Sequence, residues 1–160
     1  MTIYLATDHV GYTLKEKVKI FLKAKGYEVK DLGAHSFVPN DDYPDYISLA
    51  AQAIQKKPKD FAIVFGGSGQ GEAMVANRYH NVRCALFYGP EKPLAPVEIE
   101  GTQSTDPYEI VRLSRAHNNA NMLSIGARFV SSEEAQEAIT LWLETPFSNN
   151  PRHLRRIKKF

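Results

Sequence analysis

The sequence lacks most of the features that mark secreted, membrane-spanning or metal-stabilised proteins. A single cysteine, Cys84, excludes an internal disulfide and is typical of a reducing environment. No apolar run reaches the length of a membrane span, and the first residues lack the basic and apolar segments of a signal peptide. No group of cysteines and histidines has metal-ligand spacing. We therefore expect a cytoplasmic protein with no membrane segment, no metal and no cofactor.

Acidic residues are missing from one part of the chain, the C-terminal tail at 151–160. These ten residues carry five basic side chains, whereas the other 150 residues have a net charge of −3. Such a tail suits a nucleic-acid arm, a solvated end or a set of phosphate ligands. Because the sequence has no aromatic stacking platform or zinc-finger pattern, we expect no nucleic-acid partner.

The sequence does contain a regular alternation of short apolar runs and helix-like segments. Strands are expected over 2–7, 27–32, 61–65, 82–87 and 121–126. Helices are expected over 12–25, 45–57, 72–79, 106–118 and 131–144. This order predicts an α/β fold: one Rossmann-like, doubly wound domain over 1–160, with a five-stranded parallel sheet and helices on both faces.

One segment, 88–105, interrupts this alternation. Pro90, Pro93 and Pro96 recur at every third residue, which favours an extended, polyproline-like backbone. An insertion of this length in a compact domain is usually functional or disordered. We expect this inserted Pro-rich loop to form a lid or a rim of the pocket, or to extend a dimer interface.

A glycine-rich loop follows the strand expected at 61–65. Gly66 and Gly71 have the spacing of a nucleotide-triphosphate loop, but Glu72 replaces the required lysine and would repel phosphate. The loop also lacks the third glycine of a dinucleotide fingerprint and lies well inside the chain. A glycine turn beside a carboxylate suits proton removal next to a carbonyl, with backbone N–H groups holding the enediolate. A tight turn with a solvated glutamate fits these residues equally well.

Ligands of such folds bind at the carboxyl ends of the strands. The glycine loop lies at such an end, as do Asp8 and His9 after the first strand, and Arg128 after the fifth. Tyr43 lies in the loop after the second strand. His117 is near the end of the helix that enters the fifth strand, which places it at the opposite edge. Only curvature of the fold or a second subunit would bring it to the glycine loop.

Six motifs in this order resemble the ribose-5-phosphate isomerase B family, whose wider group includes galactose-6-phosphate and allose-6-phosphate isomerases. They are Asp8-His9 with Gly11, Asp42-Tyr43-Pro44, the loop from Gly66 to Glu72, Ala76-Asn77-Arg78, the run from His117 to Asn121, and Arg152-His153. The resemblance covers nearly the whole chain apart from 88–105. Many members carry a cysteine base where this chain has Gly66, and this sequence is similar to the branch whose base is the glutamate after the loop.

The resemblance implies interconversion of ribose 5-phosphate and ribulose 5-phosphate through a cis-enediol. Glu72 would move a proton between C2 and C1, Ser68 would assist transfer between O1 and O2, and His117 would open the furanose ring. The implied substrate-binding residues are Asp8, His9, Tyr43, Gly67, Gly69, Gln70, Gly71, Asn118, Arg128, Arg152 and Arg156. The family also implies a homodimer, or a tetramer built from it, with shared active sites that the C-terminal segment of the partner completes.

Other interpretations of these residues stay open. The substrate could be a phosphohexose, or the chain could be a non-catalytic phosphosugar-binding module. Asp8 could only cap the first helix, and His117 could only complement a helix dipole. Tyr43 could pack a turn, and without the resemblance the tail arginines would be read as solvated.

Overall fold

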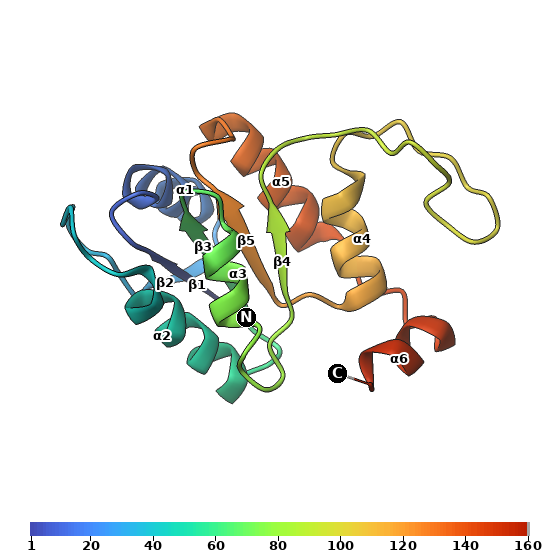
Figure 1. Ribbon diagram of the computed structural model, residues 1–160, viewed down its shortest axis with the longest axis horizontal. Coiled ribbons are helices and arrows are strands. Elements are labelled where there is room, and N and C mark those ends of the chain that lie inside the picture. Colours follow the sequence, from blue (N-terminus) through green and yellow to red (C-terminus); the bar gives the residue numbers. More distant parts are fainter. Residues whose placement is uncertain (160) are drawn as a thin grey trace.

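Five parallel strands form one sheet with the order β2-β1-β3-β5-β4 in the computed structural model, which describes residues 1–159 (Figure 1). The strands are β1 (Thr2–Thr7), β2 (Glu28–Asp31), β3 (Phe61–Gly66), β4 (Cys84–Phe87) and β5 (Met122–Gly126). The helices are α1 (Tyr12–Ala24), α2 (Tyr43–Lys56), α3 (Gln70–Ala76), α4 (Glu109–Asn118), α5 (Ser132–Glu144) and α6 (Pro151–Ile157). The predicted α/β fold is confirmed.

Helices cover both faces of the sheet because successive strand residues point to opposite sides. In β3, Ile63 and Phe65 join the core beneath α1, α4 and α5. Their neighbours Ala62 and Val64 join the core beneath α2 and α3. Since both faces are covered, the central strands β1, β3 and β5 are mostly apolar and are buried along almost their whole length.

Helix starts follow the capping chemistry of the sequence. Ser131 and Glu134 form a reciprocal capping box at α5, in which the Ser131 hydroxyl accepts from the Glu134 N–H at 3.1 Å. Several boundaries differ from the prediction by one to three residues, among them those of α2 and α3. Helix α2 begins at Tyr43 instead of residue 45, because Asp42 is the extended N-cap and proline fits the first turn. Helix α3 ends at Ala76, three residues before the predicted end at 79.

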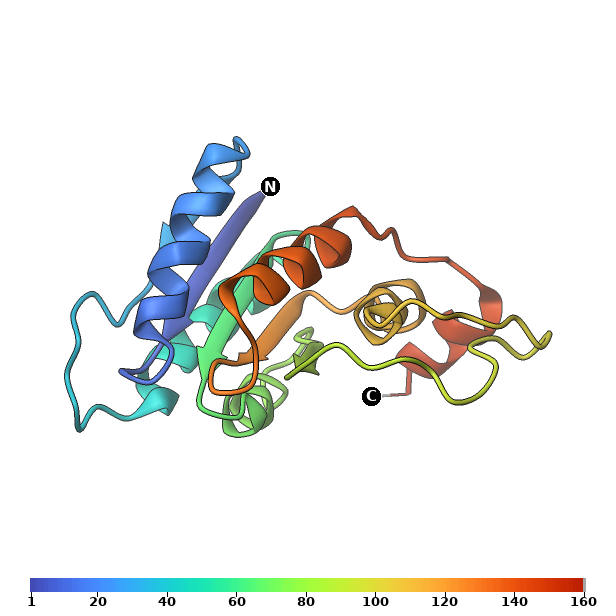
Figure 2. The same cartoon turned by 90° about the horizontal axis from the view of Figure 1, so that it is seen from above.

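The C-terminal tail contains a helix that the sequence analysis did not predict. The Asn150 side chain accepts from the Arg152 N–H at 2.9 Å, and Pro151 occupies the first helical position. Helix α6 contacts α4, and Figure 2 shows it at the same end of the molecule as the irregular segment 88–105. Within residues 1–159, no helix is both long and apolar enough to cross a membrane.

Candidate active site

The carboxylate of Glu72 lies against Gly66, at the carboxyl end of β3. A Cβ atom built on Gly66 would overlap both oxygens of this carboxylate. Glu72 is only 4% exposed. Burial raises its pKa, as does the charge of Asp8, against an opposing hydrogen bond from the Glu72 backbone. Glu72 is therefore a buried carboxyl group beside the glycine turn, which excludes the solvated glutamate of the alternative interpretation.

The glycine turn is held in place from the neighbouring strand. Gly69 has a left-handed backbone with φ of 75°, which a glycine adopts without strain. The buried Ser124 hydroxyl in β5 donates to the Gly69 carbonyl at 2.6 Å. The Ser68 hydroxyl accepts a hydrogen bond from the Gln70 N–H at 3.3 Å and stays partly exposed. These contacts fix the backbone of the turn, which carries several N–H groups and the Ser68 hydroxyl.

The loop after β5 brings Arg128 to the same place. The Ala127 and Arg128 N–H groups donate to the Gly66 and Gly67 carbonyls at 2.7 and 3.1 Å. A Cβ atom on Gly67 would contact the Arg128 guanidinium at 3.4 Å. The guanidinium is exposed beside the turn, where it can reach an anionic group of a bound molecule.

Tyr43 forms a wall of the turn from the start of α2. Its hydroxyl lies so close to Gly71 that a Cβ atom there would approach it at 2.6 Å. The structure therefore places Tyr43 on a helix at the site, and not in the preceding loop where the sequence analysis put it.

Asp8 makes a local hydrogen bond in the turn before α1 and also lies close enough to affect Glu72. One of its oxygens accepts from the Val10 N–H at 2.9 Å and so caps the turn before α1. The side chain is almost fully buried, and its negative charge acts on Glu72. Asp8 does not cap α1 itself, because the N-cap of that helix is Gly11 and no side chain accepts a capping bond there. The helix-capping interpretation is therefore wrong, and the role of Asp8 in substrate binding stays a prediction.

His9 is held by a partner that the sequence analysis missed. Asp41 accepts from the His9 ring Nδ1 at 2.6 Å and from the His9 backbone N–H at 3.0 Å. Burial alone would raise the pKa of Asp41, but these two hydrogen bonds, together with one from Tyr46 and the charge of His9, outweigh it and lower the pKa. An ionised carboxylate at Nδ1 leaves Nε2 for a ligand. The only sequence signal for Asp41 was its place directly before the Asp42-Tyr43-Pro44 motif.

Four predicted site residues lie elsewhere. His117 and Asn118 end α4, which enters β5 from the edge opposite the glycine turn (Figure 1). Arg152 and Arg156 lie on α6, which packs beside α4. The position expected for His117 from the sequence is correct. Within one chain, the glycine turn lies at the carboxyl ends of the strands, and these four residues lie toward the opposite ends.

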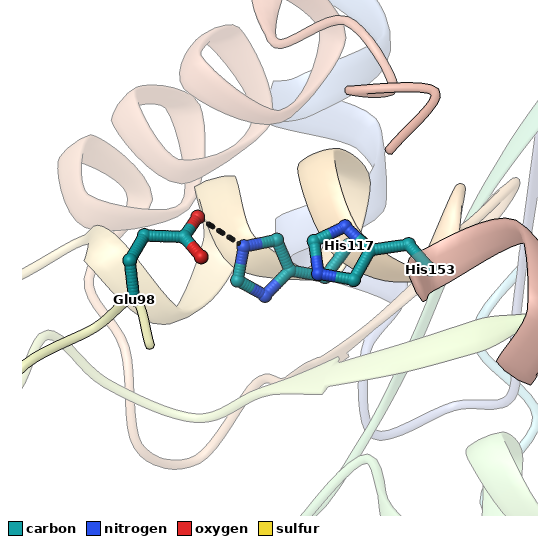
Figure 3. Close-up of side chains that lie close together, drawn as sticks. All are labelled: Glu98, His117 and His153. Carbon is teal, nitrogen blue, oxygen red and sulfur yellow. Dashed lines mark hydrogen bonds and ion pairs between the residues drawn. The ribbon is translucent and has the colours of Figure 1, made fainter. Parts of the chain in front are cut away.

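His117 has two close neighbours from distant parts of the chain (Figure 3). Its Nε2 lies 2.6 Å from the Oε1 of Glu98, which comes from the inserted segment. Its ring packs on that of His153 in α6, with centroids 4.1 Å apart. Arg152 donates to the other oxygen of Glu98 at 3.4 Å. No pattern in the sequence points to Glu98, because its segment has no regular structure.

Two groups of side chains have the donor types of a metal site, Glu98 with His117 and His153, and Asp8 with His9 and Asp41. In the first group, the Arg152 guanidinium lies 3.2 Å from the His153 Nε2 and would repel a cation. In the second, the Asp41 carboxylate already takes the His9 Nδ1. Hydrogen bonding thus occupies ligand atoms of both groups.

Cys84 lies near Glu72, but its thiol is not suited to act as a base in place of the Glu72 carboxylate. Burial and the Glu72 charge raise the pKa of the Cys84 thiol far above its ordinary value. A cavity of about 850 Å³ lies beside Cys84, between the end of α3, the start of β4, α4 and α6. Asn118, a predicted substrate-binding residue, lines this cavity. The cavity lies at the end of α3, whereas the glycine turn lies at its start.

The fold and the glycine turn define a doubly wound α/β protein with a buried carboxylate at the carboxyl ends of its strands, the usual ligand edge of this class. The family model described as "Ribose/Galactose Isomerase" matches residues 3–95 and 97–160. The chain belongs to the ribose/galactose isomerase family.

Individual relatives agree with this family. The chain is 36% identical over 157 residues to ribose-5-phosphate isomerase B of Mycobacterium tuberculosis, covering 98% of this chain and 86% of the relative. The solved structure from Mycoplasma genitalium, with bound ribulose 5-phosphate, has a TM-score of 0.85 at 34% identity and covers 99% of this chain and 92% of that one. The structure from Thermotoga maritima has a TM-score of 0.81 at 39% identity, with coverages of 99% and 95%.

Proposed function

We propose that this protein interconverts ribose 5-phosphate and ribulose 5-phosphate. The observation that carries the proposal is the buried Glu72 carboxylate, held against Gly66 beside the glycine turn. Family membership and the ribulose 5-phosphate bound to a relative of the same fold support this substrate.

The proposed proton transfer uses Glu72 as the base. In open-chain ribose 5-phosphate, Glu72 removes the proton from C2, and the electrons form the C1–C2 double bond of an enediolate. Glu72 then returns the proton to C1, which gives the ketose. The proton on O2 passes to O1 with the help of the Ser68 hydroxyl. Backbone N–H groups of Gly67, Gly69, Gln70 and Gly71 hold the developing negative charge.

Other residues bind and prepare the substrate in this proposal. Asp8 and Asn118 orient sugar hydroxyls, and Tyr43 forms a wall. His117 opens the furanose ring as acid and base. The phosphate is bound by His9, Arg128, Arg152 and Arg156, of which the arginines offer planar pairs of donors. No metal and no cofactor enters these steps.

The proposed site needs two chains. Glu72 and His117 belong to opposite edges of the sheet in one chain, so a partner must bring His117, Asn118 and the α6 arginines to the glycine turn. We propose a homodimer, or a tetramer built from it, in which the C-terminal segment of each chain completes the site of its partner. The single cysteine supports a cytoplasmic location.

Deuterium incorporation tests the reaction. Incubation with ribose 5-phosphate in D2O should place deuterium at the carbon that receives the proton, and Glu72→Gln should lower this rate by about 10³-fold. Glu133→Gln, which removes the same charge from the exposed start of α5, is the matched control and should behave as the parent. Failure to isomerise any phosphosugar would refute the proposal.

A phosphohexose substrate is the second candidate, and the inserted segment 88–105 is the observation that keeps it open. Pentose and hexose phosphates differ in the room that they need beyond the reacting carbons. We propose that this segment borders that room. Shortening it while measuring kcat/KM on ribose 5-phosphate and allose 6-phosphate tests the idea, and an unchanged ratio of the two values would leave the segment without a role in selectivity.

A further inference from the structure

The inserted segment 88–105 is irregular, yet both of its ends are tied down. The Glu91 N–H donates to the Pro107 carbonyl at 2.8 Å, and the Ser104 hydroxyl donates to the Glu109 carboxylate at 2.6 Å. The segment therefore leaves and rejoins the fold close to the start of α4.

Within the segment, a local turn presents Glu98. The Val97 N–H donates to the Thr102 carbonyl at 2.8 Å, and the Gly101 N–H donates to the Glu98 carbonyl at 3.1 Å. Gly101 has a positive φ of 89°, which the turn requires and glycine supplies. The turn fixes the backbone from which the Glu98 side chain extends toward the end of α4.

The Glu98 carboxylate joins two residues of the proposed site. Oε1 lies 2.6 Å from the His117 Nε2, and Oε2 lies 3.4 Å from an Arg152 guanidinium nitrogen. The hydrogen bond to His117 is the main cause that lowers the pKa of Glu98, and it outweighs the effect of burial. Glu98 is therefore ionised at neutral pH and accepts a hydrogen bond from the His117 Nε2–H.

His117 keeps one nitrogen for the substrate. Among residues 1–159, Nδ1 has no hydrogen-bond partner, and Figure 3 shows it on the side of the ring away from Glu98. His153 stacks on the ring, and its own Nδ1 is fixed by the Ser148 hydroxyl at 3.0 Å. Burial, His117 and Arg152 lower the pKa of His153, which keeps this neighbour neutral. The His117 ring is thus hydrogen-bonded by Glu98 at Nε2 and stacked on its face by His153.

We propose that Glu98 is a positioning residue for ring opening: it holds the Nε2–H tautomer of His117, so that Nδ1 exchanges the proton with the furanose. This inference rests on the proposed function. When Nδ1 takes the proton of the C1 hydroxyl, the ring becomes positive and Glu98 stabilises it, as carboxylates do in other carboxylate–histidine pairs. The same nitrogen then protonates the ring oxygen as its bond to C1 breaks, which gives the open aldehyde.

Two measurements on one variant distinguish a role of Glu98 in ring opening from a role in maintaining the whole site. Ribulose 5-phosphate cannot close a furanose ring, because its C5 oxygen carries the phosphate. Exchange of its C1 hydrogen with D2O therefore needs Glu72 and the glycine turn but no ring opening. In Glu98→Gln, kcat for ribose 5-phosphate should fall about tenfold or more, while the exchange rate of ribulose 5-phosphate stays within about twofold.

Glu100→Gln is the matched control, because Glu100 is exposed on the same segment and its substitution removes the same charge. It should leave both rates unchanged. Equal losses of conversion and exchange in Glu98→Gln would overturn the inference, since they would indicate damage to the whole site. Unchanged conversion would also overturn it. If the parent protein showed neither conversion nor exchange, the proposed function itself would fail.

Discussion

The carboxylate of Glu72 fills the space that a Cβ atom on residue 66 would need. Glycine at 66 and a buried glutamate at 72 therefore depend on each other. This relationship gives a steric reason why a chain with Glu72 as its base would not also carry a cysteine at position 66.

A double-mutant cycle tests this dependence. Gly66→Cys should destabilise the fold and remove activity, because the new side chain displaces the Glu72 carboxylate. Adding Glu72→Ala should recover much of the lost stability, since the clash disappears. Urea unfolding of the two single variants and the double variant measures the coupling energy. Additive free energies of unfolding would show that the two positions do not compete for space.

The pH dependence of proton transfer should report the surroundings of Glu72. Its pKa is raised by burial and by Asp8, so the acidic limb of the rate profile should lie above the ordinary pKa of a glutamate. Asp8→Asn should move that limb to lower pH, whatever it does to the maximal rate. Asp45→Asn, which removes a charge from an exposed part of α2, should leave the limb in place. A limb that does not respond to Asp8→Asn would contradict the electrostatic coupling.

Asp41 should matter for substrate binding more than for proton transfer. Asp41→Asn loses the ionised acceptor that fixes the His9 ring at 2.6 Å. We expect KM for ribose 5-phosphate to rise about tenfold, which corresponds to about 1.4 kcal/mol, with kcat nearly unchanged. Asp42→Asn, at the adjacent exposed position, is the control. A fall in kcat at constant KM would place Asp41 in the chemical step instead.

The fully buried Lys15 should make stability depend on Asp31. Its ammonium donates to both Asp31 oxygens at 2.6 and 2.7 Å and to the Ala34 carbonyl at 2.8 Å. Asp31→Asn leaves the partly exposed Glu16 carboxylate, 3.0 Å away, as the remaining ion-pair partner of this buried charge and should cost about 3 kcal/mol of unfolding free energy. Glu28→Gln, on the same strand but exposed, should cost under about 0.5 kcal/mol. Similar losses in both variants would refute the role of the buried pair.

The same pair predicts a pH dependence of stability. Burial would raise the pKa of Asp31, but the hydrogen bonds from Lys15 and Lys19 outweigh it and lower the pKa to about 2. Because the folded-state pKa lies below the unfolded value, the contribution is complete above about pH 4 and is lost as the pH falls toward 2. Denaturant titrations of the parent and of Asp31→Asn at several pH values should converge over this window.

Local patterns were sufficient to predict the fold. Apolar runs and helical spacing located the five strands and the first five helices, and Ser131 with Glu134 marked the start of α5. Such signals are readable because they come from backbone periodicity and from capping bonds between residues a few positions apart. Glu72 was found for a related reason, since its carboxylate directly follows the glycine turn in the sequence.

Tertiary structure alone decided which side chains meet. Asp41 reaches His9 across 32 residues, and Glu98 reaches His117 across 19. Both carboxylates lie on irregular stretches, where no periodicity predicts the direction of a side chain. The overlap between Glu72 and the missing Cβ of Gly66 also depends on how α3 returns over β3. These contacts arise from the path of the loops and the packing of helices on the sheet, which the order of residues along the chain does not display.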